Sequence, residues 1–344
     1  MKSAASAVAR GATLQSIAEA AGVHRSTAAR ALDPAQAHRI SPEVVEKVRA
    51  EALRQGYRRD AIAASLRTGR SRLVGVVLPD LANPVFAPIL DGVGAALAEA
   101  GYSMLVADGG TDAARQTAIV EELIARRVDG LVLATARRSD SVLTVCLDAG
   151  VPTVLVNRAE DLPRASSVVS DDICGMRLAV EHLVGLGHRR IGHLAGPDGL
   201  STGVLRRQGF EAAMRAAGLD PTAITVARAY SRAEGQAATA ALLDAAPGLT
   251  AIAASNDLLA LGAYLELARR GLSCPHDISI VGHNDMPLVD MIAPPLTTVR
   301  IAHAQMGEAA ARLLLERLAD PDAEICARLM PAQLILRGST QAVR

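Results

Sequence analysis

Apolar and polar positions follow a helical repeat near the start of the chain. Leu14, Ile17 and Ala18 fall on one face at the spacing of a short helix. Gly22 then interrupts the repeat, and it can adopt the positive φ that a tight turn requires. The pattern over residues 13–32 therefore predicts two short helices joined by a tight turn.

The second of these predicted helices has an apolar side and a polar side. Ala28 and Leu32 turn inward, which leaves Arg25, Ser26 and Arg30 on the outer side. A helix-turn-helix uses this arrangement, because its second helix enters the major groove and contacts base edges. An ordinary solvated helix face is the alternative, and the turn and the spacing favour DNA binding.

A third helix is predicted to begin at Ser41. Ser41, Pro42 and Glu43 supply a capping residue, a proline at the first helical position and an acid in the first turn. The helix continues to Gly56. The three helices together predict a small all-α DNA-binding domain over residues 10–58.

From residue 73 onward, short apolar runs alternate with helical segments. Such runs, each followed by a helix, predict an α/β fold of parallel sheets covered on both faces. The predicted strands cover residues 74–78, 104–107, 131–134, 153–156, 191–194, 224–227, 251–254 and 278–281. Ligands bind such sheets at the carboxyl ends of the strands. The polar residues at these ends are Asn157, Arg158, Ser255, Asn256, Asp257, His283, Asn284 and Asp285.

Charge is distributed unevenly along the chain. The 344 residues carry no net charge, and half of them are apolar, which is enough for more than one core. Through residue 72 there are 13 Lys and Arg against 6 Asp and Glu, whereas the remainder has 23 against 30. A basic head on an acidic body is typical of a head that contacts phosphates.

The sequence gives little support for an enzyme, a metal protein or a membrane protein. It has no Gly-x-Ser-x-Gly, Walker or His-Glu-x-x-His motif, so no catalytic site, cofactor or metal is expected. No apolar run approaches the length of a membrane span. The scattered cysteines indicate reduced thiols in a cytoplasmic protein; they are Cys146, Cys174, Cys274 and Cys326.

Motifs along almost the whole chain resemble those of the lactose-repressor/galactose-repressor family of bacterial transcription regulators. The resemblance rests on residues 14–23, Thr27 and Arg30, residues 75–84, 127–131, 187–191 and 194–197, Asn256-Asp257, and residues 277–282, 294–298 and 337–340. It implies a transcriptional regulator, and this regulator is expected to repress transcription. This regulator binds double-stranded, pseudo-palindromic operator DNA as a homodimer and responds to a small effector, such as a sugar or sugar acid.

The family also implies a domain organisation. A hinge helix and linker follow the head, and a periplasmic-binding-protein-like core of two lobes follows the hinge. The chain is expected to cross between the lobes near Ser170, Val299 and Met330. The expected ranges are 59–71 for the hinge, 72–344 for the core, about 72–169 and 301–329 for the first lobe, and about 171–299 and 331–344 for the second.

DNA contacts are expected from the second helix and from the hinge. Arg25, Ser26 and Arg30 are the candidates for contacts to bases, whereas His24 and Thr27 cap the helix or contact phosphate. For Leu66, composition alone permits a linker leucine packed on the core. The resemblance favours a wedge that enters the minor groove and kinks the duplex.

Effector contacts are expected from residues that follow the predicted strands. By resemblance these are Phe86, Asn157, Arg158, Thr202, Arg206, Tyr230, Asn256 and Asn284. Phe86 fits a core position equally well. The alternative for Arg206 is an exposed surface arginine, and the alternative for Tyr230 is an ordinary tyrosine at a strand end. Asp257 and Asp285 are predicted to be structural caps or lobe contacts.

Departures from the family pattern bear on the effector. Asn284 and Asn157 stand where relatives often have Asp, and Ala134 replaces a polar residue of some sugar binders. With Arg158 and Arg206 nearby, fewer carboxylates suggest an acidic effector such as a sugar acid. A solute-binding protein and a sugar-metabolising enzyme, which share the two-lobed core, are the alternatives to a regulator.

Overall fold

The computed structural model describes residues 12–33, 36–57 and 69–343. The chain divides into two compact units, Met1–Ser71 and Arg72–Arg344. Most of the predicted hinge, including Leu66, lies outside the described residues.

The first unit contains a three-helix core. Its elements are α1 (Leu14–Ala20), α2 (Arg25–Ala31), a short 3-10 turn (Ala37–Arg39) and α3 (Pro42–Arg54). Thr13 begins α1 with a capping box, in which its side chain and that of Ser16 each accept the other residue's backbone N–H. Ile17, Ala28 and Val48 are fully buried where the helices meet. The predicted pair of helices and its turn at Gly22, with φ 65°, are confirmed.

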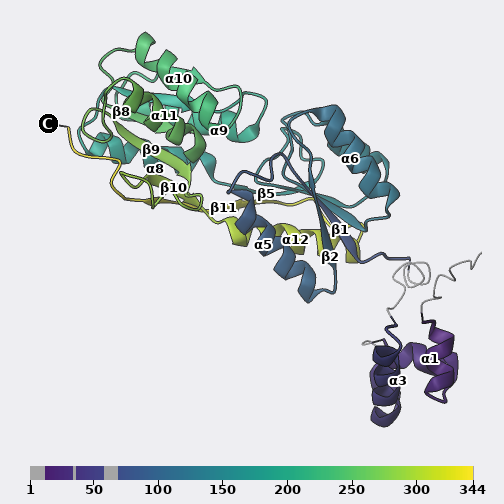
Figure 1. The fold of residues 1–344 in the computed structure, drawn as a ribbon. Helices are drawn as coiled ribbons and strands as arrows, with labels where there is room; N and C mark the ends of the chain where they lie inside the picture. The colour runs from purple at the N-terminus through teal and green to yellow at the C-terminus, as the bar shows by residue number, and fades with distance from the viewer. Residues whose placement is uncertain (1–11, 34–35, 58–68, 344) are drawn as a thin grey trace, which may run out of the picture. The chain divides into compact units, whose positions relative to one another are not determined.

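The second unit contains two lobes, each built on a six-stranded sheet (Figure 1). In the first lobe all strands are parallel, in the order β11-β5-β4-β3-β1-β2. The helices α5 and α12 cover one face of this sheet, and α6 and α7 cover the other. The elements are β1 (Leu73–Leu78), α5 (Phe86–Glu99), β2 (Ser103–Asp108), α6 (Ala113–Ala125), β3 (Gly130–Leu133), α7 (Ser141–Asp148), β4 (Thr153–Val156), β5 (Ser166–Ser170), α12 (His303–Ala319) and β11 (Ala327–Met330).

The second lobe repeats this plan, with the strand order β12-β10-β9-β8-β6-β7. Only the β10–β12 pair is antiparallel among the described strands. The helices α8 and α9 cover one face, and α10 and α11 cover the other. The elements are α8 (Asp172–Gly185), β6 (Ile191–Ala195), α9 (Ser201–Ala216), β7 (Ile224–Val226), α10 (Arg232–Ala245), β8 (Ala251–Ala254), α11 (Asp257–Arg269), β9 (Ser279–Asn284), β10 (Thr297–Ile301) and β12 (Ala332–Ile335).

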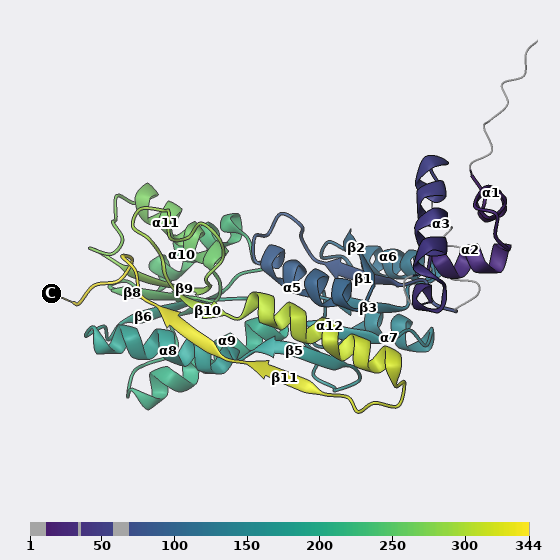
Figure 2. The same cartoon turned by 90° about the horizontal axis from the view of Figure 1, so that it is seen from below.

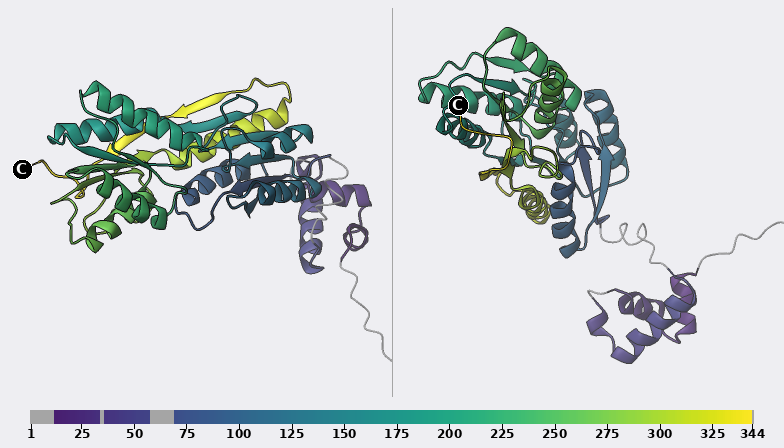
Figure 3. Two further views of the ribbon diagram at one scale, coloured as in Figure 1. Left: turned by 90° about the horizontal axis from the view of Figure 1, so that it is seen from above. Right: turned by 60° about the vertical axis from the view of Figure 1, so that its left-hand side comes forward.

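The chain passes between the lobes three times. The crossings follow β5, β10 and β11, and the yellow carboxyl-terminal segment runs from one lobe into the other in Figures 2 and 3. The second crossing comes at Ala302, slightly later than the expected position near Val299, because β10 stays paired with β12 through Ile301. Each lobe is therefore assembled from separate stretches of the chain.

The helix pair α5 and α12 packs at very close range in the first lobe. A Cβ at Gly92 would lie 2.0 Å from the carbonyl oxygen of Ala304, and one at Gly307 would lie 2.0 Å from that of Ile89. Side chains larger than hydrogen are excluded at both positions. The carboxyl-terminal helix is thereby joined firmly to a helix near the start of the core.

Candidate DNA-binding and ligand-binding sites

The start of α2 is fixed by a histidine cap. His24 has extended backbone geometry, and its Nδ1 accepts a hydrogen bond from the backbone N–H of Ser26 at 3.3 Å. The same nitrogen lies 2.8 Å from Ser26 Oγ. The predicted capping role of His24 is therefore confirmed, and it leaves Ser26 oriented at the first turn of the helix.

The polar side of α2 faces solvent. Arg25, Ser26 and Arg30 are exposed, whereas Thr27 is partly buried. Neither arginine forms an ion pair with a described residue of the chain. Two exposed guanidinium groups on a short, capped helix, without a partner among the described residues, are suited to bind phosphate oxygens or guanine edges.

The predicted effector residues lie together around one small cavity between the lobes. The cavity has a volume of about 20 Å³, close to the space that a single water molecule needs. The first lobe contributes Phe86, Asn157 and Arg158, and Asn83 and Val85 also line it. The residues from the second lobe are Thr202, Arg206, Tyr230, Asn256 and Asn284.

Phe86 serves both of the roles considered for it. It begins α5, is almost fully buried, and belongs to the apolar core of the first lobe. It also lines the cavity. The ring therefore connects the packing of α5 to any group that enters the cleft.

The asparagines at the strand ends are held in particular conformations. Asn157 and Asn284 have positive φ values of 66° and 113°, which asparagine adopts more readily than most residues. Asn256 caps α11 by accepting a hydrogen bond from the backbone N–H of Leu259 at 2.9 Å. Its Oδ1 is therefore engaged, and its amide group is left as a donor for a ligand.

Arg206 is held by a buried ion pair. Its Nε donates to Asp172 Oδ1 at 2.8 Å, and Nη1 donates to the carbonyl oxygen of Ser255 at 2.6 Å. Both side chains of the ion pair are about 3% exposed or less. Burial opposes the charge of Arg206, but the Asp172 carboxylate, together with Tyr230 and Asp257, outweighs this effect and raises the pKa of Arg206. Sequence reasoning missed Asp172, which follows β5 immediately after the helix cap Asp171.

Two further aspartates in this region have structural partners, as predicted. Asp257 accepts hydrogen bonds from Thr298 Oγ1 at 2.6 Å and from the backbone N–H of Met286 at 2.8 Å. Asp285 forms ion pairs with Arg300 and Arg337. These carboxylates connect the loops and strands of the second lobe.

A larger cavity of about 340 Å³ adjoins the small one. Asn83, Arg158 and Tyr230 line both cavities. Tyr230 reaches this position by passing over Gly196, where a Cβ would lie 2.1 Å from the tyrosine oxygen, and its O–H donates to Thr202 Oγ1 at 3.2 Å. No pattern in the sequence pointed to this second cavity.

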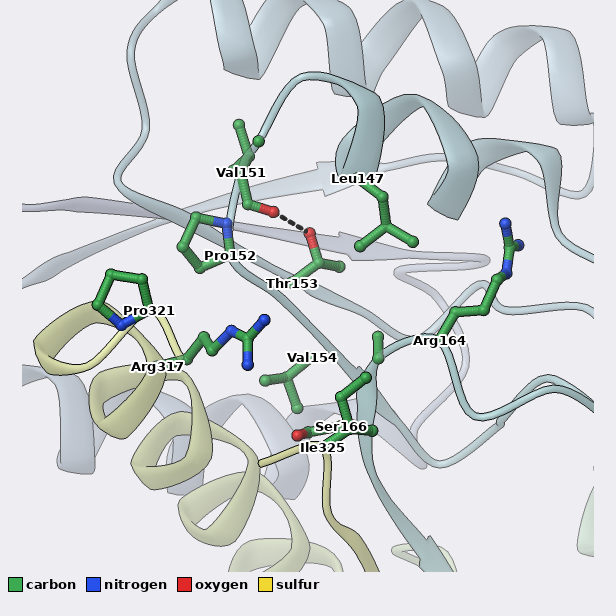
Figure 4. A pocket seen from close by; sticks show the side chains of 12 residues that line it. Leu147, Val151, Pro152, Thr153, Val154, Arg164, Ser166, Arg317, Pro321 and Ile325 are labelled. Carbon is green, nitrogen blue, oxygen red and sulfur yellow. Dashed lines mark hydrogen bonds between the residues drawn. The ribbon is translucent and has the colours of Figure 1, made fainter. Parts of the chain in front are cut away.

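A third cavity, of about 190 Å³, lies at the amino-terminal ends of strands β4 and β5 of the first lobe (Figure 4). It is next to Thr153 and Ser166, the first residues of β4 and β5, whereas Asn157 follows the other end of β4. Its arginines are engaged, because Arg164 pairs with Glu160 and Arg317 donates to the carbonyl oxygen of Ala323. This cavity is separate from the cleft and offers no convergent polar groups.

Within the described ranges, no helix combines the length and the apolar character needed to cross a bilayer. A three-helix head with a capped, basic second helix stands in one chain with a two-lobed core that has a polar cavity between its lobes. These features define the class of DNA-binding regulators that respond to a ligand.

Comparison with known proteins agrees with this class. A periplasmic binding protein-like domain matches residues 180–340. The chain is 33% identical to the HTH-type transcriptional regulator CelR of Thermobifida fusca over 95% of its length and 98% of the relative. It is 30% identical to the HTH-type transcriptional repressor CytR of Escherichia coli K12 over 96% and 97% of the two chains.

Solved structures give the same result. A lac repressor dimer bound to operator and the anti-inducer ONPF matches with a TM-score of 0.86 and 29% identity over 97% of this chain and 100% of that one. A CelR–cellobiose complex matches with a TM-score of 0.74 and 32% identity over 95% and 99%. The chain belongs to the lactose-repressor/galactose-repressor family of transcriptional regulators, and its close relatives are regulators rather than enzymes.

Proposed function

We propose that this regulator binds a pseudo-palindromic operator as a homodimer, with one α2 helix in each half-site. Arg25, Ser26 and Arg30 contact base edges, and His24 and Thr27 lie next to the phosphate backbone. The observation that carries this proposal is the exposure of both arginines, which form no ion pair with a described residue, on a helix whose start is fixed by a cap. The regulator acts on DNA in the cytoplasm, as the family does, and repression is the expected outcome.

The effector site is the cleft between the lobes, which comprises the small cavity with its predicted residues and the larger cavity that adjoins it. A ligand that bonds to both lobes favours the lobe arrangement in which these groups converge. That arrangement sets the distance between the two hinges of a dimer and thereby controls operator binding. Cellobiose in the CelR complex supports a small, hydroxyl-rich effector for this chain.

The proposal is tested by equilibrium binding of the purified full chain to duplex DNA. Sites selected from random duplexes at moderate ionic strength are expected to be palindromic, with half-sites about one helical turn apart. Binding should change when a small-molecule extract is added. Equal affinity for selected and random duplexes, with and without the extract, contradicts the proposed function.

Leu66 gives a separate prediction for the hinge. Leu66→Ala is expected to lower operator affinity without changing effector binding, because a wedge between base pairs contributes only when DNA is bound. The matched control is Leu53→Ala, since Leu53 is a head leucine that is 85% exposed. Gel-shift titration measures the first effect and a thermal shift with effector measures the second. Loss of effector binding would place Leu66 in the core instead.

A further inference from the structure

The larger cavity carries polar groups that have no hydrogen-bond partner among the described residues. Seven buried side-chain atoms of the described residues lack a hydrogen-bond partner, and three of them belong to residues that line this cavity: Gln116 Oε1, Thr135 Oγ1 and Arg158 Nε. Gln116 and Thr135 are only 2% and 1% exposed. Buried polar atoms are nearly always paired, so this concentration indicates that the cavity is built to bind a polar molecule.

The orientation of Gln116 is set by its other amide atom. Its Nε2 donates to the carbonyl oxygen of Gly110 at 2.7 Å. The Oε1 atom is therefore the free acceptor, and it needs a donor such as a ligand hydroxyl. Thr135 follows β3 and supplies a hydroxyl that donates or accepts.

Arg158 differs from the other arginines of the cleft. Arg206 is compensated by Asp172, Arg228 by Glu234, and Arg137 donates to the carbonyl oxygen of Thr111. Arg158 forms no hydrogen bond or ion pair with any described residue through its guanidinium group. Burial lowers the pKa of Arg158 to about 10, the Tyr230 hydroxyl opposes this effect, and the charges of Arg206 and Arg137 add to it. The side chain remains charged at neutral pH, and no described residue supplies a counter-ion.

Asp80 is the carboxylate among the described residues that line the cavity, and it does not act as a counter-ion to Arg158. Asp80 is exposed, and its Oδ1 accepts a hydrogen bond from the backbone N–H of Ala82 at 2.9 Å. An acidic group that enters the cavity would therefore meet Arg158, whose guanidinium group has no partner among the described residues, beside the exposed Arg137, which is bonded to a carbonyl oxygen but to no described carboxylate. Such a group gains a charge-assisted hydrogen bond, which is stronger than one between neutral groups.

We propose that the larger cavity binds the acidic part of an elongated, polyhydroxylated effector. A carboxylate or phosphate of the ligand pairs with Arg158, and a ligand hydroxyl donates to Gln116 Oε1. Because Arg158 and Tyr230 border both cavities, one molecule extends from the small cavity into the large one. This inference rests on the proposed function, since it assigns the chemistry of the effector for the same cleft.

The test uses the purified full chain and a metabolite extract separated on an anion exchanger into neutral and anionic fractions. The anionic fraction is expected to raise the melting temperature and to change operator binding, whereas the neutral fraction does neither at the same ionic strength. Treatment with a phosphatase then separates the two sources. Loss of the effect assigns a phosphate, and retention assigns a carboxylate.

Two variants connect the effect to the cavity. Without ligand, Arg158→Met and Thr135→Val are expected to melt at the same temperature as the wild type or higher, because each removes a polar group that has no partner. Arg158→Met should abolish the shift caused by the anionic fraction. Thr135→Val should raise the concentration needed for half of that shift several-fold. Arg126→Met is the control, because Arg126 is an exposed arginine paired with Glu122 and should keep the full shift.

The outcomes separate this inference from the function on which it rests. A shift caused by the neutral fraction alone, or an anionic shift retained in Arg158→Met, overturns the inference and leaves a ligand-responsive regulator. A lower melting temperature of ligand-free Arg158→Met makes Arg158 a structural residue and also overturns it. No shift from either fraction overturns both the inference and the proposed response to a ligand. Operator preference, measured separately, shows whether the DNA-binding part remains valid.

Discussion

Arg206→Met is expected to destabilise the ligand-binding core by about 3–5 kcal/mol, because it leaves the Asp172 carboxylate buried without a counter-ion. Asp172 has no second cation in hydrogen-bond contact among the described residues, and His283 Nε2 lies 3.9 Å away. Burial lowers the pKa of His283 well below its ordinary value, so this histidine is neutral and does not compensate the charge. Urea unfolding followed by circular dichroism measures the change in the free energy of unfolding.

The control is the double variant Arg206→Met/Asp172→Asn, which removes both charges together. It should recover much of the lost stability, since replacing a whole buried pair costs far less than breaking it. If the double variant is as unstable as the single one, the loss comes from packing of the arginine side chain. A single variant with unchanged stability would show that the ion pair contributes nothing to folding.

Arg30→Ala is expected to weaken operator binding by about 1–3 kcal/mol and to relax the preference at one base pair of each half-site. This corresponds to a roughly 5- to 150-fold increase in Kd. The physical reason is that a guanidinium group can donate to both acceptors of a guanine, which no other base pair presents in the same way. Titration against operators that are changed at one position at a time measures both effects at a fixed salt concentration.

Arg49→Ala is the charge-matched control for this measurement. Arg49 is exposed on α3 and belongs to the same basic head. Its loss should weaken binding to all duplexes by a similar factor, because a phosphate contact carries no sequence preference. Arg30 would be assigned to the phosphate backbone if its variant behaved in the same way as Arg49→Ala.

The apolar runs of the sequence located β1 to β4 and β6 to β9, even where polar residues flank the run as in β2 and β9, and they missed the other described strands. β4 and β8 were located to the residue, because both are buried on both faces between layers of helices. The missed strands β5, β10, β11 and β12 contain serine, threonine, arginine or glutamine. Three of them, β5, β10 and β11, come directly before the chain crosses from one lobe to the other. Polar side chains are accommodated there, so these strands have no continuous apolar run.

The candidate ligand site was predictable only in part. Family resemblance pointed to residues that the structure places around one cavity, including Asn157 and Asn284 at the ends of apolar strands. It did not distinguish Arg158 from Arg206, because the partner of Arg206 is Asp172, which is distant in sequence. Gln116 gave no signal either, since a glutamine on an amphipathic helix is usually a surface residue.

The threefold passage of the chain between the lobes affects how the protein is made. The first lobe begins at β1 but is completed by α12 and β11, whose side chains Met306, Leu313 and Leu314 fill its core. During translation, this lobe therefore keeps an open sheet edge and an uncovered helix until α12 and β11 have left the ribosome. The second lobe waits only for β12, which follows β11 directly, so the two halves of the core are expected to acquire their final packing nearly together.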